Sequence, residues 1–252
     1  MKLRGRLRAT TSGKAGGPPL VFGHGYGTGQ GMWRSFVPAF TDRYRTVTYD
    51  IAGRVAMTDR PLDRYDTLDA YAADLLGLCR ELGLEDVAFV GHSVAGIIGV
   101  LAANAEPHRF TSLVLIGSSP RYVDDRDYVG GYTRSEVEDF LEVLDNNVVD
   151  GPGSGAPGFG GWSADRLDDA RFARHFARAM FLSDHRADLQ KVTVPTLILH
   201  GDDDRLVPRP VGEYLARTIP GSRLERVTDT GHVPHLDSPV SIVTAIRRFL
   251  DR

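Results

Sequence analysis

Ser93 is the residue whose type and surroundings most clearly suggest chemistry. It lies in the run GHSVAG (91–96), where an apolar stretch (87–90) gives way to a helical pattern (94–105). This pattern is typical of a nucleophile elbow, a tight turn that holds a serine hydroxyl at the end of a strand and near the start of a helix. A serine hydroxyl is a poor nucleophile at neutral pH, so it needs a base and an acid that orients the base.

Residue types suited to both partners follow further along the chain. The apolar stretch 196–200 leads into three consecutive aspartates (202–204), and His232 follows another predicted strand at 223–227. The carboxyl ends of parallel strands meet at one edge of a sheet, where ligands bind. Serine, aspartate, histidine is also the chain order of the triad in α/β-hydrolases. The pattern leaves all three aspartates open as the acid.

An oxyanion hole needs two backbone N–H groups that face the same oxygen. Val94 directly follows the serine and is expected to supply one of them. The loop GHGYG (23–27) follows an early apolar stretch. Its Tyr26 is the expected second donor, because the flanking glycines allow its amide to turn inward.

The sequence predicts neither a metal nor an organic cofactor. No frame of residues 23–32 satisfies the dinucleotide fingerprint G-x-G-x-x-G. His232 and His235 have the spacing of a zinc pair, but the nearby sequence offers no third or fourth ligand.

Short apolar runs and helical patterns alternate along most of the chain. Continuous apolar strands that alternate with helices indicate an α/β fold, with a mostly parallel sheet covered on both faces. The predicted strands are 3–10 at an edge, 19–22, 45–49, 87–90, 112–116, 196–200 and 223–227. The predicted helices are 67–82, 94–105, 212–218 and 240–250, with a helical turn or two at 33–40.

The interval between residues 116 and 196 interrupts this alternation and is far longer than an ordinary connection. It contains a helical pattern at 135–144, with a predicted capping box of Ser135 and Glu138, and a second pattern at 164–181. Both patterns carry apolar faces, which need another part of the protein to pack against.

A segment rich in glycine and proline, 150–161, separates the two helical patterns. We therefore predict a helical lid over residues 120–190, inserted into a core formed by 1–119 and 191–252. A plain surface excursion is the alternative.

Composition narrows the class of protein. The chain has 252 residues, of which 42% are hydrophobic, which suits one globular domain or one domain with an inserted cap. A net charge of -3, with both signs spread along the chain, argues against nucleic-acid binding. The single cysteine, Cys79, excludes a disulfide within the chain. No apolar run reaches membrane-span length, and we expect a cytoplasmic protein without membrane contact.

Several segments resemble one known family. They are the elbow VGHSVAGIIG (90–99), the run SSPRYVDD (118–125) with GGY (130–132), and FLSDHR (181–186). Together they resemble the RsbQ-like bacterial hydrolases and the plant karrikin and strigolactone receptors, and the likeness spans nearly the whole chain. The elbow is common among hydrolases, whereas the PRYV and SDHR segments are more selective.

The resemblance implies an α/β-hydrolase fold with a helical lid. It singles out Asp204 among the aspartates, by its distance to Val207 and Pro208, and leaves Asp202 and Asp203 as alternatives. The implied site residues are Ser93, His232 and Asp204 as the triad, with Tyr26 and Val94 as oxyanion donors.

The expected reaction is hydrolysis of a small ester or lactone through an acyl-enzyme. Residues of the predicted substrate pocket are His24, Trp33, Phe140, Phe159, Trp162 and Phe181, although each of the aromatic residues also suits core packing. A slow-turnover receptor that presents its lid to a protein partner is an alternative. A non-hydrolytic biosynthetic enzyme is another, suggested by the bulkier, charged turn at 51–57.

Overall fold

The computed structural model describes residues 2–52, 62–145 and 170–251. This part of the chain forms a seven-stranded sheet with the order β1-β3-β2-β4-β5-β6-β7, in which β1 is antiparallel to β3 and the other pairs are parallel. The strands are β1 Thr10–Gly13, β2 Pro19–Gly23, β3 Arg45–Tyr49, β4 Val87–His92, β5 Phe110–Ile116, β6 Thr196–Gly201 and β7 Arg223–Val227. The prediction of a mostly parallel α/β sheet is confirmed.

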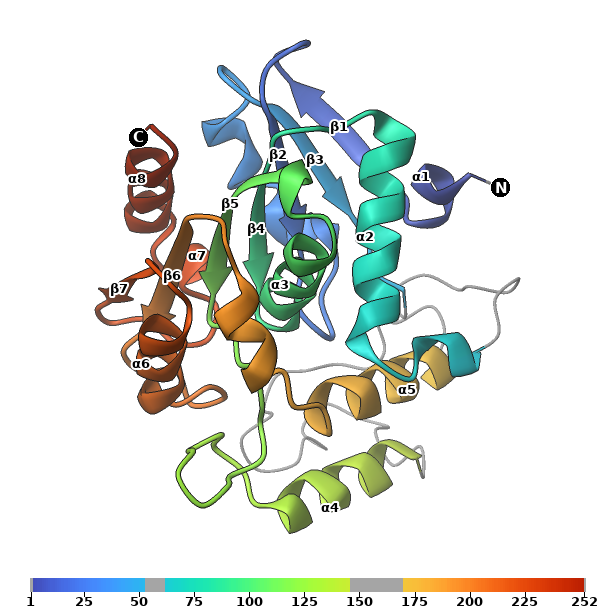
Figure 1. The fold of residues 1–252 in the computed structure, drawn as a ribbon, viewed down its shortest axis with the longest axis vertical. Coiled ribbons are helices and arrows are strands. Elements are labelled where there is room, and N and C mark those ends of the chain that lie inside the picture. The colour runs from blue at the N-terminus through green and yellow to red at the C-terminus, as the bar shows by residue number, and fades with distance from the viewer. Residues whose placement is uncertain (1, 53–61, 146–169, 252) are drawn as a thin grey trace.

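Helices surround this sheet (Figure 1). The α-helices are α1 Leu3–Arg6, α2 Leu68–Leu82, α3 Val94–Ala105, α4 Arg134–Asp145, α5 Ala170–Phe181, α6 Arg209–Thr218, α7 Pro234–Asp237 and α8 Pro239–Leu250. Short 3-10 helices are η1 Gln30–Trp33, η2 Val37–Ala39, η3 Leu62–Tyr65, η4 Pro107–Arg109 and η6 Arg186–Lys191. The 3-10 helices η1 and η2 overlap the stretch 33–40, where the sequence predicted a helical turn or two, at residue 33 and at residues 37–39.

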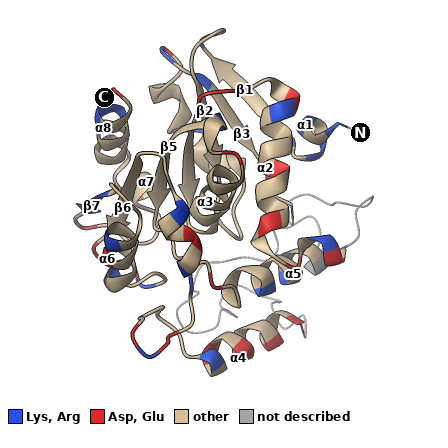
Figure 2. Cartoon of the chain, in the orientation of Figure 1, with Lys and Arg blue, Asp and Glu red and all other residues tan. Residues whose placement is uncertain are grey.

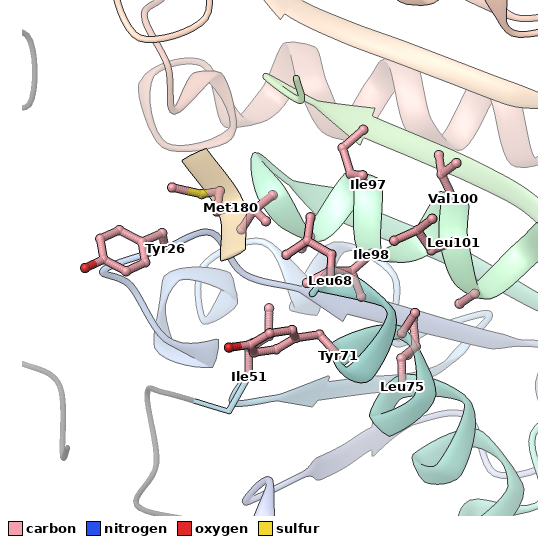
Figure 3. Close-up of a cluster of buried hydrophobic side chains, with 14 of the residues drawn as sticks. Tyr26, Ile51, Leu68, Tyr71, Leu75, Ile97, Ile98, Val100, Leu101 and Met180 are labelled. Carbon is pink, nitrogen blue, oxygen red and sulfur yellow. The ribbon is translucent and has the colours of Figure 1, made fainter. Parts of the chain in front are cut away.

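Alternating residues along a strand pack into two separate hydrophobic clusters. In β4, Val87 and Phe89 face a cluster that includes α2, α3 and α6, whereas Ala88 and Val90 face a cluster that includes η1 and α8. This alternation follows from the two-residue repeat of a strand. Figure 3 shows part of the first cluster, where side chains of α2 and α3 approach Tyr26 and Met180.

Helices α4 and α5 belong to the segment between β5 and β6. In Figure 1 they lie below the sheet, beyond the ends toward which the parallel strands run. Phe140 of α4 packs edge-on against Phe181 of α5, with ring centroids 5.2 Å apart. The predicted middle of this segment, 150–161, and the turn at 53–57 lie outside the described residues.

Ion pairs connect the start of the segment between β5 and β6 to its end. Arg121 donates to Asp184 at 2.7 Å, and Arg186 also donates to Asp184 at 2.7 Å. Arg186 additionally reaches Asp125 at 2.9 Å and lies 5.1 Å from the ring centre of Tyr128. The PRYV and SDHR segments, which lie before α4 and after α5, therefore meet in the structure.

Two local predictions are wrong. The alternating pattern at 3–10 does not form an edge strand, because Leu3–Arg6 is the helix α1 and the edge strand is β1. The carboxylate of Glu81 in α2 accepts the backbone N–H of Leu3 at 2.7 Å and so holds the start of α1. This contact spans 78 positions, and a pattern within a short window contains no sign of it.

The capping box of α4 lies two residues earlier than the sequence predicted. Glu136 accepts the backbone N–H of Thr133 at 2.7 Å, and the Thr133 hydroxyl accepts the N–H of Glu136 at 3.2 Å. The reciprocal pair is therefore Thr133 with Glu136, and α4 begins at Arg134, one residue before the predicted start.

Charged side chains of both signs lie along α2, α4 and α6, whereas the Lys, Arg, Asp and Glu positions of α5 are all arginines (Figure 2). Cys79 is buried in α2, and burial raises the pKa of its thiol to about 12. In the described ranges, no helix combines the length and the apolar character that crossing a membrane requires.

Candidate active site

Ser93 occupies the sharp corner between β4 and α3. Its backbone has φ 55° and ψ -126°, a left-handed conformation that side-chain-bearing residues rarely adopt. The corner closes tightly, because a Cβ added to Gly91 would lie 2.5 Å from the backbone nitrogen of Gly96. A Cβ on Gly96 would in turn collide with the Ser118 hydroxyl. The small residues of the GHSVAG run are thus what the turn requires.

Asp204 and His232 meet at the carboxyl ends of β6 and β7. The Nδ1 of His232 lies 2.8 Å from the Oδ2 of Asp204. The other carboxylate oxygen, Oδ1, accepts the backbone N–H groups of Leu206 and Val207, both at 2.9 Å. One oxygen is therefore fixed by the turn, and the other is directed at the imidazole. A carboxylate in this position holds a neutral histidine as the Nδ1–H tautomer, with Nε2 left as the basic nitrogen.

The two neighbouring aspartates have different surroundings. Asp202 accepts from the guanidinium of Arg226 at 2.8 Å, and Asp203 is exposed. The carboxylate of Asp204 is nearly fully buried, with 1% of its side chain exposed.

The end of β5 packs against the Asp204–His232 pair. Gly117 has a φ of 56°, and a Cβ at this position would lie 3.3 Å from His232 Nδ1 and 3.4 Å from Asp204 Oδ2. A larger residue would be strained and would press on both side chains. The glycine therefore allows the backbone to come close to the pair.

His92 links the serine turn to the histidine loop. It directly precedes Ser93, and its Nε2 lies 2.9 Å from the backbone carbonyl oxygen of His232. The rings of His92 and His232 are 4.9 Å apart. Ser93 and His232 thus belong to segments that are in direct contact.

The loop after β2 also lies close to Ser93. A Cβ on Gly25 would lie 3.2 Å from the Cβ of Ser93. His24 stabilises the loop, since its Nε2 accepts the Ile51 N–H at 2.8 Å and its Nδ1 lies 2.8 Å from the Gly25 carbonyl oxygen. The buried His24 therefore has a role in holding backbone together.

Tyr26 follows Gly25 in this loop, next to α5. Its side chain is buried, and its ring lies 5.7 Å from that of Phe176 in α5. Burial raises the pKa of the Tyr26 phenol above its usual value. Val94 directly follows Ser93 and is the first residue of α3, and first-turn N–H groups have no acceptor within their helix.

Tyr122 is a residue that the sequence-based site did not include. Its phenol oxygen lies 3.5 Å from the Oγ of Ser93, and 2% of the residue is exposed. Burial raises the pKa of this phenol, so the group stays protonated at neutral pH. The selective PRYV segment was the available signal, since Tyr122 is its third residue.

The predicted pocket aromatics divide between two places. Phe181 packs 4.9 Å from the ring of Tyr122, and Phe140 packs on Phe181, so ring contacts link both residues to Tyr122 beside Ser93. Phe159 and Trp162 are outside the described residues.

Trp33 is a correction to the predicted pocket. It has no exposed surface and belongs to the core cluster on the opposite face of the sheet. Its ring lies 5.3 Å from Phe22 and stacks on His235 at 4.6 Å. This tryptophan is packed as core, and His235 is its stacking partner. Within the described ranges, no three His, Cys, Asp or Glu side chains gather as metal ligands would.

Most of the sequence matches a known family. Residues 20–245 match the family described as Alpha/beta hydrolase. The chain belongs to this family. The predicted fold and the prediction of a hydrolase are therefore confirmed.

Individual relatives cover nearly the full chain. It is 36% identical to a strigolactone esterase of Arabidopsis thaliana, over 92% of both chains. It is 33% identical to a karrikin insensitive receptor of Petunia hybrida, over 94% of this chain and 93% of the relative. The resemblance to karrikin and strigolactone receptors is thus confirmed. A solved hydrolase from Oleispira antarctica superposes with a TM-score of 0.90 at 27% identity, covering 99% of this chain and 96% of that one.

Proposed function

We propose that this protein is a serine hydrolase that cleaves a small ester or lactone through Ser93, His232 and Asp204. The observation that carries the proposal is the 2.8 Å contact between His232 Nδ1 and Asp204 Oδ2, on loops next to the strained serine turn. A carboxylate that orients an imidazole beside a serine is the arrangement that activates a hydroxyl for attack.

The reaction follows from these roles. His232 Nε2 takes the proton of the Ser93 hydroxyl while Oγ forms a bond to the substrate carbonyl carbon. The tetrahedral oxyanion is held by the backbone N–H groups of Tyr26 and Val94. The carbon–oxygen bond to the alcohol then breaks, and His232 gives its proton to the leaving oxygen.

Water completes the cycle. His232 takes a proton from water, whose oxygen attacks the acyl-enzyme, and the bond to Ser93 Oγ breaks as the hydroxyl regains its proton. With a lactone, the leaving alcohol stays attached to the acyl group, so the product is one hydroxy acid.

We further propose that residues 120–190 act as a lid over this site. The contact of Phe176 with Tyr26 and the contact of Phe181 with Tyr122 support this role, since both join α5 to groups beside Ser93. The apolar rings favour a substrate with an apolar part next to its ester group.

The proposal is tested with p-nitrophenyl acetate and a fluorophosphonate probe. We expect wild-type protein to hydrolyse the ester and to be labelled at Ser93, and Ser93→Ala to lose both properties. Equal turnover by Ser93→Ala, or labelling of a different residue in the wild type, would reject the mechanism.

A slow-turnover receptor is the second candidate, favoured by the 33% identity to a karrikin receptor along nearly the whole chain. A panel of lactones separates the two functions. A receptor would bind a lactone tightly, turn it over negligibly and capture a protein partner only in its presence, whereas an enzyme would turn over repeatedly without one.

A further inference from the structure

We propose that His92 is a positioning residue that fixes the backbone of the base His232 relative to the nucleophile Ser93. This role is additional to the triad and rests on the proposed function. His92 is fully buried, at the carboxyl end of the central strand β4 and immediately before the serine.

The tautomer of His92 follows from its contacts. Its Nε2 lies 2.9 Å from the carbonyl oxygen of His232, and a carbonyl can only accept a hydrogen bond. Nε2 must therefore carry the proton. Nδ1 has no hydrogen-bond partner among the described residues, which is consistent with a neutral ring protonated at Nε2 alone.

His92 stays in this state across the neutral range. Burial, together with the neighbouring His235 and His232, holds the pKa of His92 well below its usual value. The ring therefore does not compete with His232 for protons. It acts as a constant donor to one backbone oxygen.

The hydrogen bond completes the support of His232. Asp204 binds the ring of His232 at Nδ1, whereas His92 binds the main chain of the same residue. With only one of these two contacts, His232 could pivot about that contact. Both contacts together determine where the remaining nitrogen, Nε2, lies. Because His92 adjoins Ser93, the support is attached directly to the nucleophile's own segment.

The other edge of the His92 ring faces the loop of Tyr26. A Cβ on Gly25 would lie 2.7 Å from His92 Nδ1 and 3.1 Å from its Cε1. The oxyanion loop therefore rests on the same imidazole that holds the base. His235 packs on this ring as well, with centroids 4.7 Å apart. His92 thus contacts two of the segments that the reaction requires, the loop of His232 and the loop of Tyr26.

A matched pair of substitutions separates positioning from packing. His92→Gln keeps an amide N–H three bonds from Cβ, as in the Nε2–H of histidine, and can reach the His232 carbonyl. His92→Met has similar length and burial but no donor. We measure the fluorophosphonate labelling rate of Ser93, the kcat and KM for p-nitrophenyl acetate, and the melting temperature of each variant.

We expect His92→Met to lower kcat and the labelling rate by about 10- to 100-fold, with KM changed less than about twofold, because a small displacement of a base slows proton transfer more than binding. We expect His92→Gln to recover most of this loss. If His92→Met does not fold, His92→Asn replaces it, since its shorter amide does not reach the carbonyl.

The outcomes distinguish this inference from the proposed function. A wild-type protein that is not labelled at Ser93 would overturn both. Normal labelling and turnover in the wild type, with equal rates in His92→Met, would overturn the positioning role alone. Equal losses in the Gln and Met variants would also overturn it, since the donor would then make no difference.

Discussion

The phenol oxygen of Tyr122 lies 3.5 Å from the Oγ of Ser93, at the outer limit of a hydrogen bond. The phenol remains protonated, because burial raises its pKa. It is therefore a donor beside the point where a substrate oxygen would arrive.

We expect Tyr122→Phe to lower kcat/KM for p-nitrophenyl esters by about 3- to 10-fold, the equivalent of one neutral hydrogen bond. Stability should change little, because the ring keeps its packing on Phe181. Tyr128→Phe is the control, because it also removes a hydrogen-bonded tyrosine hydroxyl, one that donates to the Arg121 carbonyl at 2.8 Å. A rate equal to that of the wild type in Tyr122→Phe would show that the hydroxyl takes no part.

Asp204→Asn should lower kcat by about 10³- to 10⁴-fold. The amide has one oxygen, whereas Asp204 accepts from two backbone N–H groups and also faces His232 Nδ1. The substitution thus favours the wrong tautomer of His232. Steady-state turnover measures the effect, and Asp203→Asn, at the exposed neighbouring position, is the matched control. A comparable loss of kcat in Asp203→Asn would show that Asp204 is not the specific acid partner of His232.

The backbone of Ser93 predicts a difference between two inactive variants. A residue with a Cβ at φ 55° is strained, whereas glycine adopts positive φ readily. We expect Ser93→Gly to be more stable than Ser93→Ala by about 1 kcal/mol in urea unfolding, despite the larger chain entropy of unfolded glycine. Equal or reversed stabilities would argue against strain at the turn.

His235 predicts a loss of stability in acid. Burial, and to a smaller extent His232, lowers its pKa to about 3, whereas an unfolded histidine titrates near about 6.5. Below the unfolded pKa the unfolded chain takes up a proton that the folded chain does not. The free energy of unfolding therefore decreases as the pH falls from about 6.5 toward 3.

His235→Phe should remove this proton linkage while keeping an aromatic ring against Trp33. We expect its free energy of unfolding to depend less on pH between 4 and 6.5, by up to about 1.4 kcal/mol per pH unit. Denaturant titrations of both proteins at several pH values measure the slope. Parallel slopes would contradict the prediction.

Local patterns were sufficient for much of this protein. The short strand patterns predicted β2 and β3 nearly to the residue, because a buried strand is determined by a few adjacent side chains. The small residues around Ser93 predicted the turn, because only they permit its close backbone contacts. The order of serine, aspartate and histidine suggested the proposed triad before any distance was known.

Other features depended on partners far away in the chain. Leu3 begins a helix because Glu81 accepts its N–H, and Trp33 is core because the sheet separates it from the predicted pocket. Neither contact has a signature within a short stretch of sequence. Among three adjacent aspartates, only the fold decides which carboxylate lies against His232.

The sequence by itself determined the fold class, the serine turn and the residue types available for the reaction. Only the tertiary structure decided how these residues are supported. The hydrogen bond from His92 to His232 spans 140 positions, and Tyr122 reaches Ser93 from the segment that follows β5, the strand next to β4 in the sheet. The physical reason is that side-chain patterns encode local conformation, whereas contacts among loop residues depend on how parallel strands bring their ends to one edge.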